Sequence, residues 1–280
     1  MALIGTLYIV ATPIGNLEDL SPRAARILGE VDLIACEDTR QTRKLLDHLK
    51  LHKPMVSLHE HNEQERTGEL IGRLEQGVSI ALVSDAGTPA ISDPGYRLIH
   101  EAAGRRIPVS AIPGPNAAIT ALCASGLPTD AFFFAGFFAH KRTQRIQQLQ
   151  KLKELPATLI FYETPHRILD ALEDIQTVLG ARPVVVGREL TKLHEEFLRG
   201  TALSIHAMLS ARAAIRGEFT VLVGKAAPDR GEAGSDVASA VGEYVGKGLS
   251  RMDAIKAVAR DRDLPKREVY RMLEEKQLPK

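Results

Sequence analysis

Five short apolar stretches alternate with five helical patterns over the first 125 residues, and this alternation constrains the fold more than any other feature. Each apolar stretch is short enough for a buried strand and runs into a polar loop. This order is typical of βαβ units, in which the strands lie parallel and helices cover both faces of the sheet. We therefore expect an α/β domain. The predicted strands are residues 6–11, 31–36, 55–58, 79–83 and 109–112, and the predicted helices are 22–28, 41–49, 63–75, 96–105 and 117–125.

Three of these helices carry start signals. Ser21-Pro22 is typical of an N-cap followed by the first helical residue. Asn62, with Glu65 three residues later, predicts a reciprocal capping pair for the third helix. Asp93-Pro94 repeats the N-cap and proline pattern and predicts the start of the fourth helix.

The loop after the fourth strand is the strongest candidate for a binding site. Between Asp85 and Gly95 it holds two Asp, two Gly and two Pro in eleven residues, whereas an ordinary strand–helix connection needs about two to six residues. Open α/β sheets bind ligands just beyond the carboxyl ends of their strands. Polar clusters also follow the other predicted strands, so we expect these clusters to converge on one edge of the sheet. The alternative is a connection with no ligand.

The pattern changes after residues 126–129, which resemble a hinge. An aromatic strand at 132–138 and strands at 158–162, 184–186, 196–198 and 219–224 predict a second α/β domain with a mixed sheet. Its predicted helices are 141–155 and 168–179. We expect domains at residues 1–126 and 127–227, a linker at 228–235, and a helix-turn-helix-like module at 236–280 with helices at 237–247, 252–260 and 268–276.

The net charge of +1 predicts no general attraction to nucleic acid, so any such affinity has to be local. Two segments are locally basic. The predicted helix 141–155 has five Lys or Arg before its first acid, and residues 247–271 hold eight basic and four acidic residues. Either segment is a candidate RNA contact, with a solvated helix face as the alternative. Cys36 and Cys123 lie in apolar segments, and we expect both to be core residues in a reduced compartment.

Several classes of protein lack support. No apolar run approaches about 18–20 residues and the first residues carry no basic leader, so we expect no signal peptide, no membrane span and a cytoplasmic location. The glycine fingerprint of dinucleotide-binding proteins, the phosphate-binding P-loop, the zinc motifs C-x-x-C and H-E-x-x-H and the G-x-S-x-G nucleophile motif are absent. His59 and His61 could face the same way, but no third ligand is evident, so we expect no metal site.

Six blocks in order resemble the small-subunit ribosomal RNA (cytidine-2′-O)-methyltransferase I group, which has the tetrapyrrole methylase fold. The resemblance covers nearly the whole chain. It implies two α/β domains with S-adenosylmethionine between them, methylation of the ribose of a decoding-centre cytidine in 16S rRNA, and a homodimer. The blocks are residues 11–17 (ATPIGNL), 36–40 (CEDTR), 84–89 (SDAGTP), 112–117 (IPGPNA), 161–167 (FYETPHR) and 217–220 (GEFT).

The resemblance also implies positions for the cofactor-binding residues. The first domain is expected to hold the methionine part of the cofactor, and the second to cover the adenosine. In this chain Asp85-Ala86-Gly87 replaces the Gly-Asp-Pro of other members of the fold. The implied residues are Pro13, Asp85, Ala86, Gly87, Ile91, Ala117 and Ala118 in the first domain and Tyr162, Leu190, Phe219 and Thr220 in the second.

Methyl transfer to a hydroxyl is an in-line displacement, so we expect positioning and a nearby base to supply the rate. The candidates at the predicted strand ends are Glu37, Asp38, His61, Glu163 and Lys192, and we predict Asp38 and Glu163 as the bases. Asp38 and Arg40 could form an acid–base or phosphate-binding pair, or a surface salt bridge. The predicted phosphate contacts are Arg40, Arg167 and Lys192.

Two other functions remain open from the sequence. A methyltransferase of the same fold could act on a tetrapyrrole, although a small substrate needs no basic module. A non-catalytic RNA-binding factor could use the cofactor pocket as a sensor. The polar residues at four or more strand ends favour an enzyme, since a passive pocket needs few titratable groups.

Overall fold

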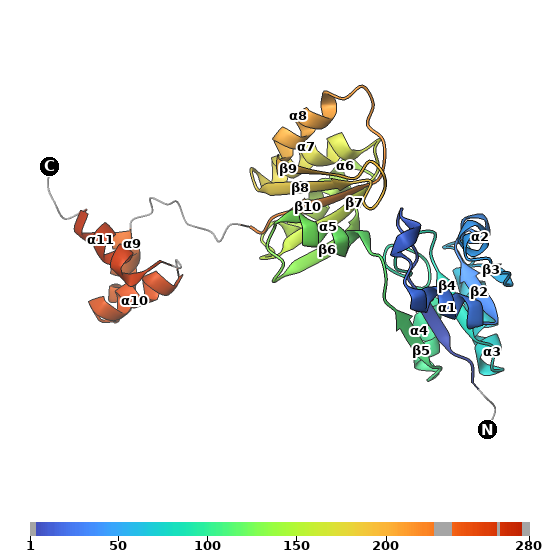
Figure 1. The fold of residues 1–280 in the computed structure, drawn as a ribbon. Helices are drawn as coiled ribbons and strands as arrows, with labels where there is room; N and C mark the ends of the chain where they lie inside the picture. Colours follow the sequence, from blue (N-terminus) through green and yellow to red (C-terminus); the bar gives the residue numbers. More distant parts are fainter. Residues whose placement is uncertain (1–3, 227–236, 262–263, 276–280) are drawn as a thin grey trace. The chain divides into compact units, whose positions relative to one another are not determined.

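A computed structural model describes residues 4–226, 237–261 and 264–275 of the chain. The chain forms two compact units, residues 1–225 and 226–280, which we describe separately. Figure 1 labels the elements of both units.

The first half of the larger unit is built on a parallel sheet, as the alternation of strands and helices predicts. Its strand order is β3-β2-β4-β1-β5, and each neighbouring pair is parallel. The strands are β1 (Leu7–Val10), β2 (Leu33–Cys36), β3 (Met55–Ser57), β4 (Ile80–Val83) and β5 (Val109–Ile112). The helices are α1 (Pro22–Glu30), α2 (Thr39–His48), α3 (Glu63–Glu75) and α4 (Tyr96–Gly104), with a short 3-10 helix η1 (Leu17–Asp19) after β1.

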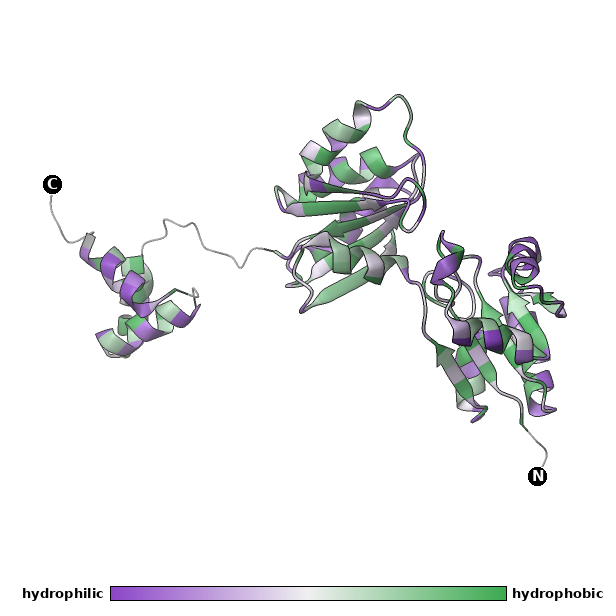
Figure 2. Cartoon of the chain, viewed as in Figure 1, coloured by the Kyte–Doolittle hydropathy of each residue, from purple (hydrophilic) through white to green (hydrophobic). Residues whose placement is uncertain are grey.

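Both faces of this sheet are covered, because successive strand residues point to opposite sides. In β2, Leu33 and Ala35 join the core formed with α3 and α4, whereas Ile34 and Cys36 join the core formed with α1 and α2. Strands that are buried on both faces have sequences that are continuous apolar runs rather than alternating ones. Figure 2 shows hydrophobic residues predominating along the central strands, whereas the covering helices carry many hydrophilic ones.

The second half of the larger unit has a mixed sheet, which confirms the second prediction of fold class. The strand order is β6-β7-β10-β8-β9, and only the β6–β7 pair is parallel. The strands are β6 (Phe132–Phe137), β7 (Thr158–Glu163), β8 (Pro183–Arg188), β9 (Glu196–Thr201) and β10 (Phe219–Val223). The helices are α5 (Ala117–Ser125), α6 (Arg142–Leu152), α7 (Ile168–Leu179) and α8 (Ala202–Ser210).

Helix α5 packs on the second sheet, although it follows the last strand of the first. Its buried residues Ala118 and Leu122 lie in one core with Ile160, Val185 and Leu222 of that sheet. Helices α6, α7 and α8 cover the opposite face. The predicted domain boundary follows residue 126, whereas α5, which ends at Ser125, already packs with the second half.

Helices α3 and α4 begin at the predicted residues, Glu63 and Tyr96, but their predicted capping interactions are wrong. Asn62 occupies the N-cap position of α3, but its side chain makes no capping bond; its Oδ1 accepts from the His59 N–H and its Nδ2 donates to the Ser57 carbonyl. The N-cap residue of α4 is Gly95 rather than Asp93. The carboxylate of Glu63 accepts the N–H groups of Gly95 and Arg97, so a side chain from α3 caps α4 and leaves Asp93 free for another role.

Three further findings differ from the sequence-based expectations. Cys123 is exposed, because it lies on the side of α5 that faces away from the second sheet, whereas Cys36 is buried as predicted. Helix α8 follows β9 and was not anticipated. Arg145 of α6 is 2% exposed and binds Asp174, so it cannot belong to an RNA-binding surface.

The smaller unit is a helical module with its own core. It consists of α9 (Val237–Gly246), α10 (Arg251–Asp261) and α11 (Lys266–Glu275), as the sequence predicts for this region. Residues such as Val241, Ile255, Val258 and Val269 form its core. The predicted linker at 228–235 lies outside the described residues. None of the described helices is long and apolar enough to span a membrane.

Candidate active site

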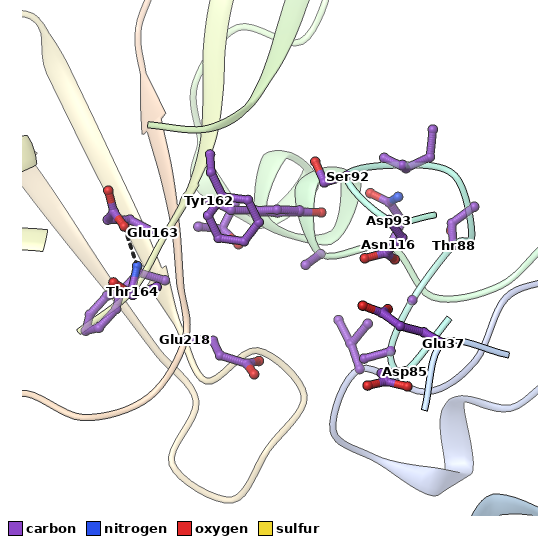
Figure 3. Close-up of a pocket in the computed structure, with 18 of the residues that line it drawn as sticks. Glu37, Asp85, Thr88, Ser92, Asp93, Asn116, Tyr162, Glu163, Thr164 and Glu218 are labelled. Carbon is purple, nitrogen blue, oxygen red and sulfur yellow. Dashed lines mark hydrogen bonds between the residues drawn. The ribbon is translucent and has the colours of Figure 1, made fainter. Parts of the chain in front are cut away.

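A cavity of about 420 Å³ lies at the carboxyl ends of the parallel strands, where the loops after β2, β4 and β5 meet the second sheet (Figure 3). Parallel sheets place ligand sites at this edge. The first half lines it with Ile14, Glu37, Asp85, Ala86, Gly87, Thr88, Ile91, Ser92, Asp93, Asn116 and Ala117, and the second half with Phe137, Tyr162, Glu163, Thr164, Pro165, Glu218, Phe219 and Thr220.

Hydrogen bonds to the backbone of the loops after β1 and β5 hold the loop after β4 in place. Thr12 and Gly87 exchange two backbone hydrogen bonds of 2.9 and 3.0 Å, and the Thr88 hydroxyl donates to the Pro115 carbonyl over 3.0 Å. Gly87 has φ +83°, which favours glycine. Ala90 and Ser92 are also left-handed, at φ 67° and 63°, and strain of this kind is concentrated at functional sites.

Two carboxyl groups in the cavity have raised pKa values. Burial, opposed by a hydrogen bond with Ser84 and reinforced by the negative charge of Asp85, raises the pKa of Asp93 to about 6. Burial and the charges of Asp85 and Asp93 also raise the pKa of Glu37. Figure 3 shows Glu37, Asp85 and Asp93 on the same side of the cavity. This wall is therefore acidic and suits a cationic ligand.

The opposite wall, which we call the aromatic wall, contains the aromatic residues Phe137, Tyr162 and Phe219. The Tyr162 ring contacts Phe134 and Phe137 edge to face, with ring centroids 4.9 and 5.6 Å apart. The Tyr162 hydroxyl accepts the N–H of Ala118 over 3.2 Å, which ties the start of α5 to β7. Burial raises the pKa of this phenol. An apolar wall beside a few fixed polar groups is the usual composition of a small-molecule site.

Most residues predicted to bind the cofactor are brought together here. Eight of them line the cavity: Asp85, Ala86, Gly87, Ile91, Ala117, Tyr162, Phe219 and Thr220. Pro13, Ala118 and Leu190 are outside the lining. Pro13 is next to the lining residue Ile14, Ala118 donates its N–H to Tyr162, and Leu190 is buried in the core beneath α5.

Asp38 and Arg40 form a close pair outside the cavity lining. Asp38 is the N-cap of α2 and accepts the backbone N–H of Arg40, while the Arg40 guanidinium donates to both carboxylate oxygens. These bonds lower the pKa of Asp38 to about 2. The backbone N–H of Asp38 donates to Asp85 over 3.0 Å, so the pair is adjacent to the acidic wall. A carboxylate of such low pKa is a poor proton acceptor near neutral pH.

Glu163 lines the cavity but is engaged elsewhere. Its Oε1 accepts the Thr164 N–H and lies 2.7 Å from Arg167, and its side chain is fully buried. Figure 3 shows Glu163 on the far side of Tyr162 from Glu37 and Asp85. Its Oε2 is buried with no hydrogen-bond partner among the described residues. Arg167 is also largely buried, which limits it as a phosphate contact.

Lys192 lies between two carboxylates at the rim. Its Nζ is 2.9 Å from Glu189 and 3.0 Å from Glu218, and Glu218 is part of the cavity lining. The Lys192 side chain also contacts the loop after β1: a Cβ built on Gly15 would be 2.4 Å from the Lys192 Cγ. Glycine at position 15 is therefore required for the two loops to approach.

Sequence reasoning missed several lining residues, among them Ile14, Phe137 and Glu218. Each lies in a segment that was noted for another reason, namely the ATPIGNL block, the aromatic strand and the GEFT block. Asp93 lies in the loop predicted as a binding site, but its own predicted role is that of a helix cap. No group of three or more potential metal ligands occurs in the described part of the chain.

Comparison with known proteins identifies the family. The sequence pattern of the Tetrapyrrole (Corrin/Porphyrin) Methylases matches residues 6–205. A Halalkalibacterium halodurans protein named Ribosomal RNA small subunit methyltransferase I is 52% identical over 95% of this chain and 93% of its own length. The Bacillus subtilis protein of the same name is 44% identical over 95% of this chain and 93% of its own length.

Solved structures show the same fold. The uroporphyrin-III C-methyl transferase of Thermus thermophilus, complexed with S-adenyl homocysteine, matches with a TM-score of 0.54 and 17% identity over 79% of this chain and 97% of its own. At this identity the likeness establishes the fold, and the function follows from the closer relatives. The chain is therefore a methyltransferase that belongs to the tetrapyrrole methylase family, and within it to the ribosomal RNA small subunit methyltransferases I.

Proposed function

We propose that this protein uses S-adenosylmethionine to methylate the ribose 2′-hydroxyl of a decoding-centre cytidine in 16S rRNA. The observation that carries the proposal is the cavity, whose acidic wall faces an aromatic wall at the carboxyl edge of the parallel sheet. The names of relatives that are 44–52% identical support an rRNA substrate.

The cavity residues fit this cofactor. When bound, S-adenosylmethionine supplies an electrophilic methyl group on a positively charged sulfur. Glu37, Asp85 and Asp93 place negative charge where a cation would bind, and Tyr162 and Phe137 offer flat surfaces for an adenine ring. These residues, with Ala117 and the Asp85-Ala86-Gly87 loop, would hold the cofactor.

Within the cavity, Asp93 and Glu37 are the favoured proton acceptors for the ribose hydroxyl. A general base works best when its pKa lies near the working pH, and the pKa of Asp93 is raised to about 6. Asp93 is therefore largely ionised at pH 7 and able to accept a proton. The negative charge of Asp93, together with burial and the charge of Asp85, raises the pKa of Glu37 as well.

The four residues predicted from sequence as catalytic fit supporting roles better. Asp38 holds Arg40 at the edge of the site, Arg167 neutralises Glu163 beneath Tyr162, and Lys192 links the rim carboxylates. We propose that Arg40 contacts the RNA backbone, while Glu163 and Lys192 position the aromatic wall of the cavity.

Two surfaces could provide further RNA affinity. On α6, Arg142 is paired with buried Asp174, which leaves the exposed lysines Lys151 and Lys153 at the end of the helix. In the C-terminal unit Arg251, Lys266 and Arg267 are exposed. The unit is thus a candidate RNA-binding module whose affinity would fall with salt.

A homodimer and a cytoplasmic location are part of the same proposal. Phe132 and Phe133 on the edge strand β6 are 46% and 43% exposed, which is compatible with a contact between copies. Sedimentation of the full chain would test the dimer.

The decisive experiment is transfer of labelled methyl from S-adenosylmethionine to unmethylated 30S subunits, with naked 16S rRNA and a tetrapyrrole precursor in parallel. We expect ribose-linked label in the subunit sample. Label in the tetrapyrrole alone would retain the fold and refute the substrate. Cofactor binding without transfer to any substrate would identify the protein as a sensor.

A further inference from the structure

A second hollow, also of about 420 Å³, lies beside α2 and the start of β3, outside the cavity described above. Its lining holds three cationic side chains and no carboxylate. We will call it the α2 groove. It is formed by Thr39, Arg40, Arg43, Lys53, Pro54 and Met55.

The cations of the α2 groove are available to a ligand. In the described part of the chain Arg43 has no ion-pair partner, and it is exposed. Arg40 binds Asp38 through Nε and Nη2, yet its side chain is still 86% exposed. Lys53 donates to the Val31 carbonyl over 2.8 Å, which fixes its Nζ while leaving its charge unneutralised.

The α2 groove is also close to the active site. Glu37 lines the cavity and Arg40 lines the groove, and three residues span at most about 11 Å even when fully extended. Between them, the Asp38 N–H donates a hydrogen bond to the Asp85 carboxylate in the cavity wall. Since β3 is the outermost strand of its sheet, the groove lies at an edge that a long polymer can pass.

We propose that the α2 groove binds a phosphodiester of the RNA chain next to the target nucleotide, and so positions the ribose at the cavity. This inference rests on the proposed function, because it assumes an RNA substrate. An arginine guanidinium can donate two parallel hydrogen bonds to two oxygens of one phosphate. Phosphate contacts fix the position of a nucleic acid on the protein without reading its sequence. Arg43 is the central contact, since no carboxylate competes for it.

The test compares Arg43→Ala with Lys44→Ala in the full chain. Both residues are exposed on α2, but only Arg43 lines the groove, so the pair is matched for charge and helix position. Binding of unmethylated 30S subunits is measured at several chloride concentrations. We expect Arg43→Ala to weaken binding about tenfold and to reduce the slope of log affinity against log salt by about 0.7–0.9. Lys44→Ala should stay within about twofold of wild type.

Two results would overturn the inference. Equal losses in both variants would indicate general electrostatics, and no loss in Arg43→Ala would show that the groove does not contact the RNA. Cofactor binding and thermal unfolding are recorded for both variants, so that a folding defect is recognised. Arg43→Lys, which retains the charge without the fork, should lose less than Arg43→Ala.

Methyl transfer by the wild-type protein separates the two proposals. If it modifies the subunits while Arg43→Ala binds normally, the α2 groove inference fails alone. If the wild-type protein modifies only the tetrapyrrole, the proposed function fails. If its binding to 30S subunits is also independent of salt, the α2 groove inference fails as well.

Discussion

The carboxylates that face the cavity from the parallel-sheet half and the buried carboxylates of the mixed-sheet half have opposite electrostatic surroundings. In the parallel-sheet half, Glu37, Asp85 and Asp93 face the cavity, and none of them forms an ion pair in the described residues. In the mixed-sheet half, buried Glu163 and Asp174 each contact arginine.

This difference distinguishes carboxylates that can exchange a proton during catalysis from carboxylates that hold the structure in place. A buried carboxylate without a cation has a raised pKa and can exchange a proton near neutral pH, as the pKa of about 6 for Asp93 illustrates. A carboxylate bound to arginine holds its neighbours in position. Residue type alone does not distinguish the two, so Glu163 and Asp93 look equivalent in the sequence.

The largest expected effect comes from Asp93→Asn, which removes the unpaired carboxylate. We expect the rate of methyl transfer to fall by about 10²–10⁴-fold with little change in cofactor affinity. In wild type the rate should rise with pH through about 6, because the base acts in its deprotonated form, and this rise should be absent from the variant. Rate measurements between pH 5 and 8 test both points.

The control for this prediction is Asp38→Asn, whose carboxyl is already ionised throughout that range. It should leave the shape of the pH profile unchanged. A profile altered by Asp38→Asn but not by Asp93→Asn would reverse the assignment.

The next effect is on stability in the mixed-sheet half. Asp174→Ala leaves Arg145 buried without its partner, so the free energy of unfolding should fall by about 3–5 kcal/mol. Asp170→Ala changes an exposed residue of the same helix and should cost less than about 0.5 kcal/mol. Urea denaturation measures both. Similar losses would show that the buried pair is not what stabilises this half.

A smaller effect is expected at the contact between α5 and β7. Tyr162→Phe removes the acceptor of the buried Ala118 N–H, which should cost about 1–3 kcal/mol in unfolding free energy. Tyr96→Phe, at a tyrosine that is 67% exposed, provides the comparison and should be near neutral. Chemical denaturation of the two variants side by side decides whether this hydrogen bond fastens the aromatic wall.

The smallest effect is the pH dependence of stability contributed by Asp93. Its pKa is higher in the folded state, so between pH 3.8 and about 6 the folded state binds more protons than the unfolded state. Stability from this group therefore decreases as pH rises through that window. Solvent screening of a partly exposed carboxyl limits the change to about 1 kcal/mol. If thermal unfolding at pH 5 and pH 7 differs by the same amount in wild type and Asp93→Asn, the carboxyl makes no such contribution.

Local pattern was sufficient for the secondary structure and the fold class. Apolar runs predicted strands β1–β5, and the Ser21-Pro22 signal predicted the start of α1. These features depend on residues within one turn or one strand, so they can be predicted without long-range contacts. The order of strands and helices then indicated the parallel sheet.

Only the tertiary structure decided which charged residues can do chemistry. Asp93 is released from capping because Glu63, 32 residues before Gly95, caps α4. Arg145 is withdrawn from the surface because Asp174 on the next helix binds it. Such pairings join residues that are distant in the chain, and their effect on a pKa depends on burial and on the charges nearby. The sequence by itself determined the elements and the edge where a site would form, whereas packing determined the walls of that site and which carboxylates face it without a cation.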